Sequence, residues 1–88
     1  MTVFLVHCQY FDYNECSGGS MLRGVYSSME KAIEARNAYI AAEIAECAKM
    51  HCDVRESFDY QNNPVIDRLV NGEIVEGNSY TISEWPLE

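Results

Sequence analysis

Apolar and polar residues alternate in short runs near both ends of the chain and follow a helical period in its middle. The segment Thr2–Phe11 carries apolar side chains on both faces, which is typical of a central strand that is covered, at least in part, on each side. Leu22–Tyr26 and Tyr80–Trp85 are predicted to be further strands. The polar segment between the first two contains Gly18 and Gly19 and predicts a flexible hairpin connection.

A long helix is predicted from about Ser28 to His51, because this segment contains neither Gly nor Pro. Ser27, three residues before Glu30, predicts a capping box at its start. One apolar stripe follows the period of about 100° per residue, and we expect it to lie on the sheet. Its members are Met29, Ile33, Ile40, Ile44, Cys47 and His51.

A ridge of small residues lies beside this stripe and consists of Ala38, Ala41, Ala45 and Ala48. Alanine is the best helix former, so the ridge needs no further cause. A helix of this length would nevertheless measure about 36 Å, against about 30 Å for a compact domain of this size. Either the helix breaks near its end or part of it overhangs. In the second case the ridge is exposed, and we expect it to form a homodimer contact.

The segment Val65–Val70 has two interpretations. It suits a short helix ended by Asn71-Gly72, or a strand that the same two residues join to a following strand through a type I′ turn. A hairpin with this turn would set Asp67 opposite Glu76, and like charges in that position are unfavourable. The pattern therefore favours the short helix. The whole chain, residues 1–88, is predicted to be a single α+β domain, in which the long helix packs on one face of a three- or four-stranded, mainly antiparallel sheet. Its first and last strands should be neighbours.

The chain carries 14 carboxylates and six Lys and Arg, a formal net charge of −8. The cations are scattered, so direct binding to nucleic acid or to an anionic membrane is not expected. The charge favours a basic partner, although acidity can also serve solubility alone. The apolar run at the N-terminus has no basic leader and is interrupted by His7, which predicts neither a signal peptide nor a membrane span. We expect a cytoplasmic protein with free thiols.

Cys47 and His51 share a helix face and could hold a metal ion with His7, Cys8 and Cys16 as further ligands. The chain has no C-x-x-C pair, and Cys47 and His51 belong to the stripe that is predicted to be core. We therefore expect no metal and no cofactor. A Cys–His pair could activate a thiolate, but no catalytic motif surrounds these residues, so no catalytic residue is assigned.

Aromatic residues and carboxylates occur together near strand ends and loops, a combination that is typical of protein-binding surfaces. The candidate binding residues are Tyr13, Glu15, Tyr39, Glu43, Glu46, Asp59, Tyr60, Glu84 and Trp85. The alternative is that most of these aromatics complete a small core.

The segment Leu22–Ala32, which contains GVYSSMEKA, resembles the strand-to-helix junction of short uncharacterised phage and bacterial domains, as does the C-terminal YTISEWPL. The resemblance covers about half of the chain and brings no catalytic residues with it. It implies a phage accessory protein acting in the host cytoplasm. We expect a non-enzymatic protein that inhibits a host defence or nucleic-acid-binding protein by protein–protein contact. The alternative is a binder, or sponge, of a small ligand or nucleotide, with its pocket between sheet and helix or at a dimer interface.

Overall fold

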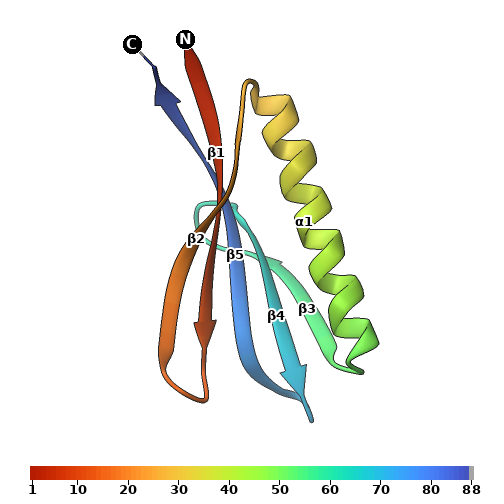
Figure 1. The fold of residues 1–88 in the computed structure, drawn as a ribbon. Helices are drawn as coiled ribbons and strands as arrows, with labels where there is room; N and C mark the ends of the chain where they lie inside the picture. Colours follow the sequence, from red (N-terminus) through yellow and green to blue (C-terminus); the bar gives the residue numbers. More distant parts are fainter. Residues whose placement is uncertain (88) are drawn as a thin grey trace.

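A computed structural model describes residues 1–87 and shows one helix packed on one face of a five-stranded antiparallel sheet (Figure 1). The elements are β1 (Thr2–Asp12), β2 (Ser17–Tyr26), α1 (Met29–Lys49), β3 (Asp53–Phe58), β4 (Pro64–Val70) and β5 (Glu73–Pro86). The strand order is β2-β1-β5-β4-β3. The predicted α+β architecture and the neighbouring first and last strands are confirmed. The predicted number of strands is too low by at least one.

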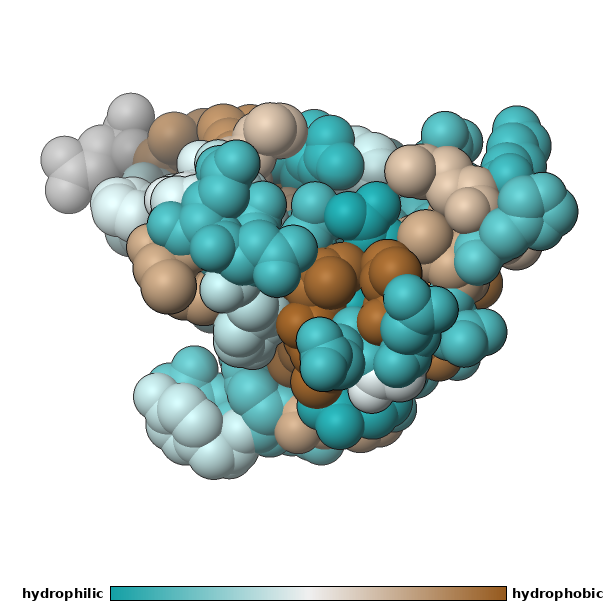
Figure 2. All heavy atoms as spheres, turned by 90° about the horizontal axis from the view of Figure 1, so that it is seen from below, coloured by the Kyte–Doolittle hydropathy of each residue, from teal (hydrophilic) through white to brown (hydrophobic). Residues whose placement is uncertain are grey.

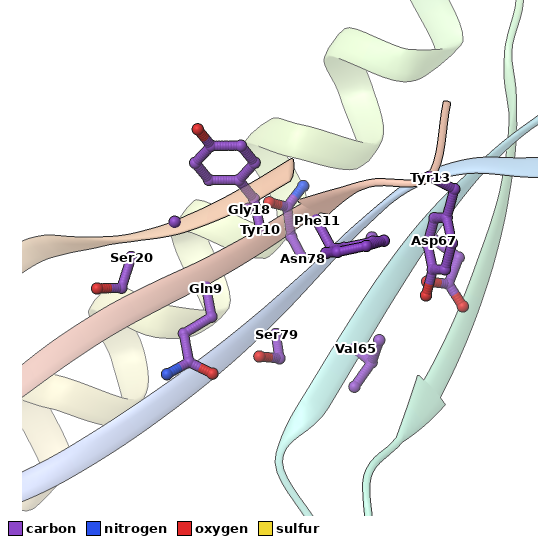
Figure 3. Close-up of a pocket in the computed structure, with 12 residues that line it drawn as sticks. Gln9, Tyr10, Phe11, Tyr13, Gly18, Ser20, Val65, Asp67, Asn78 and Ser79 are labelled. Carbon is purple, nitrogen blue, oxygen red and sulfur yellow. The ribbon is translucent and has the colours of Figure 1, made fainter. Parts of the chain in front are cut away.

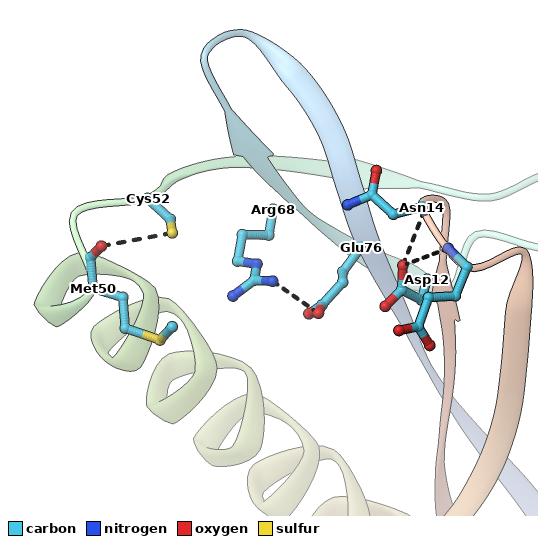
Figure 4. Close-up of polar contacts among 7 residues, drawn as sticks. Asp12, Asn14, Met50, Cys52, Arg68 and Glu76 are labelled. Carbon is cyan, nitrogen blue, oxygen red and sulfur yellow. Dashed lines mark hydrogen bonds and ion pairs between the residues drawn. The ribbon is translucent and has the colours of Figure 1, made fainter.

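The segment predicted to be a short helix is strand β4, and it forms a hairpin with β5. Asn71 and Gly72 both have positive φ, 53° and 80°, as a type I′ turn requires. An irregularity next to Arg68 shifts the register by one residue, so that Glu76 faces Arg68. Their side chains form an ion pair of 2.8 Å on the side of the sheet toward α1 (Figure 4). The bulge thus removes the like-charge contact that counted against the hairpin.

The first hairpin is longer than predicted, because β2 begins at Ser17 and takes in both glycines of the expected loop. A Cβ atom on Gly18 would lie 2.7 Å from the carbonyl oxygen of Tyr10. Only glycine therefore fits at this position, where the backbone of β2 lies very close to that of β1. The turn itself is closed by Asp12, whose carboxylate accepts hydrogen bonds from the backbone N–H groups of Asn14 and Glu15 (Figure 4).

Ser28, not Ser27, caps α1, one residue later than predicted. Its hydroxyl accepts the N–H of Lys31 at 3.2 Å, whereas Ser27 receives only the Lys31 ammonium group. Glu30 therefore does not occupy the capping-box position. The helix ends at Lys49, and His51, predicted to be its last residue, has a left-handed φ of 57° and leads the chain into β3.

The face of α1 that packs on the sheet is rotated from the predicted apolar stripe. Ile40, Ile44 and Cys47 pack against the sheet as predicted, but Met29 and Ile33 are exposed, as is His51. Ala32 is fully buried instead. The rotation follows from polar contacts: Tyr39 and Glu43 turn toward the sheet, where their side chains hydrogen-bond Tyr26 and Tyr80.

The core lies between α1 and the middle strands, around Cys8, Ile66 and Tyr80. No element among residues 1–87 covers the opposite face of the sheet (Figure 1). The expectation that β1 is covered on both faces is therefore not met within one copy of the chain. At the end of the molecule that carries the β4–β5 turn, apolar side chains reach the surface, surrounded by hydrophilic ones (Figure 2). Val70 and Met50, both about half exposed, lie near this end.

Candidate binding site

The four cysteines and two histidines are distributed over β1, the turn that follows it, the end of α1 and the segment between α1 and β3. All four cysteines are free thiols, and residues 1–87 contain no group of three His, Cys, Asp or Glu that could hold a metal ion. Cys47 is buried, whereas His51 is exposed beyond the end of α1. Burial raises the pKa of the Cys8 thiol and that of the Cys47 thiol, which disfavours the thiolate that a nucleophile needs.

The nine predicted binding residues do not form one surface. Tyr13 and Glu15 lie at the tip of the β1–β2 hairpin, and Asp59 and Tyr60 lie in the loop between β3 and β4. Glu46 is exposed on α1. Glu84 and Trp85 are adjacent in β5, so their side chains point to opposite faces of the sheet. The structure therefore brings these residues together only as sequence neighbours.

Two of the nine make contacts inside the protein. Tyr39 donates a hydrogen bond to the carbonyl oxygen of Arg23 at 3.2 Å and accepts one from Tyr26 at 2.7 Å. Glu43 accepts the hydroxyl of the fully buried Tyr80. These bonds connect α1 to the sheet and hold the helix in place.

The first of two grooves, the α1–β3 groove, has a volume of about 580 Å³ and lies on the helix side of the sheet. Its walls include Ile40, Ala41 and Ile44 of α1, Phe58 of β3, and Pro64 and Ile66 of β4. Strand β3 pairs only with β4, so its other edge has no strand neighbour among residues 1–87. An apolar groove beside an unpaired strand edge can take an extended segment, whose backbone would bond to the edge and whose side chains would fill the groove.

The loop at the end of this groove is held rigid by Asp59. The Asp59 carboxylate accepts backbone N–H groups of Asn63 and Gln61, each at 2.9 Å, and these bonds, that of Asn63 foremost, lower its pKa. The rigid loop leaves Phe58 68% exposed and Tyr60 95% exposed. A loop backbone that is ordered before binding loses little conformational entropy on contact, which favours exposed aromatic side chains on it as anchors.

The four alanines of the predicted ridge are exposed on α1, so they are available for contact. Ala41 also lines the α1–β3 groove. No part of the structure covers the other three.

The second groove, the Phe11 groove, lies on the face of the sheet opposite α1 and has a volume of about 620 Å³ (Figure 3). Its lining includes Gln9, Phe11, Tyr13, Ser20, Asp67 and Ser79. The rings of Phe11 and Tyr13 meet edge to face, with centroids 4.8 Å apart, and form one end of the groove. Uncharged hydrogen-bonding side chains from β1, β2 and β5 line the remainder.

Among residues 1–87, Asp67 is the one charged group that lines the Phe11 groove, and it is 5% exposed. Its carboxylate is paired at 2.9 Å with the guanidinium of Arg55, so the pair is neutral overall. A Cβ on Gly77 would lie 2.6 Å from Asp67 Oδ1 and 3.6 Å from the Tyr13 ring. Glycine at position 77 thus gives the space in which Asp67 and Tyr13 pack together.

The sequence pattern named Asp59 and Tyr60 as candidates but did not indicate the groove beside them. The missed residues, among them Phe58, Pro64 and Ile66, become neighbours only through the pairing of β3 with β4. The available signal was local: Asn63-Pro64 follows two aromatic residues in a short polar segment, which marks a turn that presents aromatic side chains.

α1 is too polar to serve as a membrane-spanning helix, and residues 1–87 contain no other candidate.

A scan against protein-family models, a search of curated proteins and a search of solved structures each gave no match to this chain. The candidate site is therefore defined by its own geometry and chemistry.

Proposed function

We propose that this protein is a non-enzymatic binding protein whose α1–β3 groove takes an extended segment of a basic partner protein. The observation that carries the proposal is the unpaired edge of β3 beside an apolar groove. Backbone hydrogen bonds to the edge would supply affinity, and alternate side chains of the segment would enter the groove. Phe58 and Tyr60, held by the rigid loop, are the proposed anchors.

Charge supports a basic occupant. The chain has a net charge of −8, and Glu56 lines the groove together with one cation, Arg36. Two further carboxylates, those of Asp53 and Asp59, lie on β3 and in the loop that follows it. Opposite charges accelerate association and disfavour acidic competitors. A nucleic-acid-binding protein of a host is a basic partner of this kind. Inhibition of such a protein by a phage-encoded chain in the host cytoplasm is the biological setting that we propose.

A peptide-display library of random eight-residue segments tests this function. Selected peptides should be basic and should carry apolar residues at alternate positions. Phe58→Ala should weaken their binding at least about tenfold, since truncation of an interface anchor costs more than about 1.4 kcal/mol. Tyr10→Ala is the matched control, because Tyr10 is a half-exposed aromatic residue outside this groove. Its binding should equal that of the wild type.

Two results would count against the proposal. Selected peptides with acidic or uniformly polar sequences would contradict the expected chemistry. Equal binding by wild type and Phe58→Ala, together with loss of binding in Tyr10→Ala, would move the site to the hairpin.

A second candidate function is the binding of a small ligand in the Phe11 groove. The observation in its favour is the combination of two aromatic rings with uncharged hydrogen-bonding groups and a neutralised carboxylate. The described part of the chain contributes no Lys or Arg side chain to this groove, so its chemistry suits an uncharged polar ring, such as a nucleoside, better than a nucleotide. A panel of nucleosides should then raise the melting temperature of the wild type but not that of Gln9→Ala.

A further inference from the structure

The open face of the sheet, opposite α1, differs from the rest of the surface in charge. On β1, β2 and the part of β5 that pairs with β1, the charged residues are Asp12, Arg23, Glu76 and Glu84. The guanidinium of Arg23 lies over the ring of Tyr39, a residue of α1. Glu76 pairs with Arg68 on the helix side.

Strand alternation shows on which face of the sheet the side chains of Asp12 and Glu84 lie. Glu84 has the same parity along β5 as the buried Tyr80, and Asp12 is the register partner of Glu76. Both therefore belong to the helix side. Across these three strands, the open face carries no charged side chain among the residues described, although the chain has a net charge of −8.

Apolar side chains take the place of charge on this face. Leu22, Val25 and Trp85 are 52%, 55% and 56% exposed. Register sets Val25 beside Leu5 and Trp85 beside Val3. Exposed large apolar residues that lie side by side on one face mark an interaction surface.

The polar groups in the middle of the face bond to one another. Ser83 shares hydrogen bonds with His7 Nε2 at 3.1 Å and with Trp85 Nε1, which donates to it at 3.2 Å. At the β3–β4 side of the face, Asp67 is neutralised by Arg55. When such a face is covered, these polar groups lose water but keep their partners within the protein, so the cost of desolvation is small.

The area of the uncharged face is large enough for a specific interface. β1, β2 and residues 76–86 of β5 contribute 11, 10 and 11 residues. With a rise of about 3.3 Å per residue and a strand spacing of about 4.8 Å, this part of the face measures roughly 510 Å². Two such faces would bury roughly 1,000 Å² in total, about the area that a specific interface has to exceed.

We propose that the open sheet face binds a second copy of this chain, to give a two-fold dimer of two sheets packed face to face between two outer helices. Two copies with a charge of −8 repel through the rest of their surfaces, whereas the faces formed by β1, β2 and the paired part of β5 can meet without opposing like charges. On the same side of the sheet, Asp53 lies on the outer strand β3, two residues from Arg55. Sheets pack face to face about 10 Å apart. The Phe11 groove then lies between the two sheets.

This interface differs from the alanine ridge, and paired variants separate the two. Leu22→Glu and Val25→Glu place a carboxylate on the exposed side of the edge strand β2, where neither side chain contributes to the core. Ala45→Glu is the matched control, since it adds the same charge at an exposed position of α1. Circular dichroism first verifies that each variant is folded.

Sedimentation equilibrium of the full chain gives the dissociation constant of the dimer. The wild type should dimerise at micromolar concentration. Leu22→Glu and Val25→Glu should each weaken the dimer at least about tenfold, because each buries an unpaired charge. Ala45→Glu should leave it unchanged. A monomeric wild type, or a dimer that Ala45→Glu dissociates while Leu22→Glu does not, would overturn the proposal.

Salt dependence provides a second, independent measurement. Added salt screens the repulsion between the two acidic chains, whereas no attractive charge pair is formed across the face. Dimerisation should therefore strengthen as NaCl increases. Weakening of the dimer with added salt would show an interface held by opposite charges and would refute the proposed face. Binding of a basic segment in the α1–β3 groove should weaken with salt, so the two proposals fail or succeed separately.

Discussion

Tyr80 of β5, whose side chain is fully buried, donates its hydroxyl hydrogen bond to the carboxylate of Glu43 on α1. This bond connects the centre of the sheet to the middle of the helix. Beside it lies Cys8, whose thiol donates to the side-chain oxygen of Asn78 at 3.6 Å. Burial of a carboxylate without a hydrogen-bond donor is unfavourable, and Tyr80 supplies the donor for Glu43. Without it, Glu43 would favour a rotation of α1 that exposes its carboxylate to solvent.

Removal of the Tyr80 hydroxyl should therefore destabilise the protein. We expect Tyr80→Phe to lower the free energy of unfolding by about 1–3 kcal/mol, because the half-buried Glu43 loses its donor. Urea denaturation measures the change. Glu43→Gln is the control, since its amide oxygen can still accept the hydroxyl, and it should cost less. A loss of stability in Tyr80→Phe that persists undiminished in the Glu43→Ala background would show that the two side chains are not coupled.

Alkaline pH should destabilise the fold. Burial, followed by the bond to Glu43, raises the pKa of Tyr80 above the ordinary value of 10.0. Donation to Tyr39 raises the pKa of Tyr26, and burial raises that of Cys8 and Cys47 from 9.0. The unfolded chain releases these protons at lower pH than the folded protein, so the stabilisation is complete below about pH 9 and decreases above it.

Urea denaturation at pH 8, 10 and 11 tests this pH dependence. Where Tyr80 is ionised in the unfolded chain but not in the folded protein, its ionisation should lower the free energy of unfolding by at most about 1.4 kcal/mol per pH unit. Tyr80→Phe should have a shallower slope above pH 10 than the wild type. Identical slopes for the two proteins would rule out this role for Tyr80.

The start of α1 provides a direct comparison between two adjacent serines. Ser28→Ala should cost about 1 kcal/mol, because the Ser28 hydroxyl accepts the N–H of Lys31. Ser27→Ala should be nearly neutral, since Ser27 contacts only the flexible ammonium group of Lys31 at 3.4 Å. Thermal unfolding of both variants decides between them. A larger loss in Ser27→Ala would restore the capping box that the sequence pattern favours.

The amino-acid pattern was sufficient for the parts of the fold that depend on local properties. A long segment without Gly or Pro predicted α1, and the apolar runs near both ends of the chain predicted β1 and part of β5. The hairpin of β4 and β5 was wrongly assigned, because its register depends on a bulge beside Arg68 that no local pattern reveals. That shift exchanges a repulsive partner of Glu76 for an attractive one.

The rotation of α1 and the composition of the site have non-local causes. Apolar periodicity assigned Ile33 to the core and Tyr39 to the surface, whereas hydrogen bonds to the sheet turn Tyr39 inward and leave Ile33 38% exposed. Aromatic residues near loops could be identified from the sequence. Their grouping could not, because Phe58 and Ile66 meet only when β3 pairs with β4.

The contact between Asp67 and Gly77 leads to the last prediction. A Cβ at position 77 would approach Asp67 Oδ1 to 2.6 Å, so Gly77→Ala must displace a carboxylate that is paired with Arg55. We expect a loss of about 1–3 kcal/mol, as for other overpacked sites. In the Asp67→Ala background the obstructing oxygen is absent, and the same Gly77→Ala change should cost markedly less. Urea denaturation of the four proteins gives the coupling energy. Equal costs in both backgrounds would mean that the strand itself, and not Asp67, requires glycine at this position.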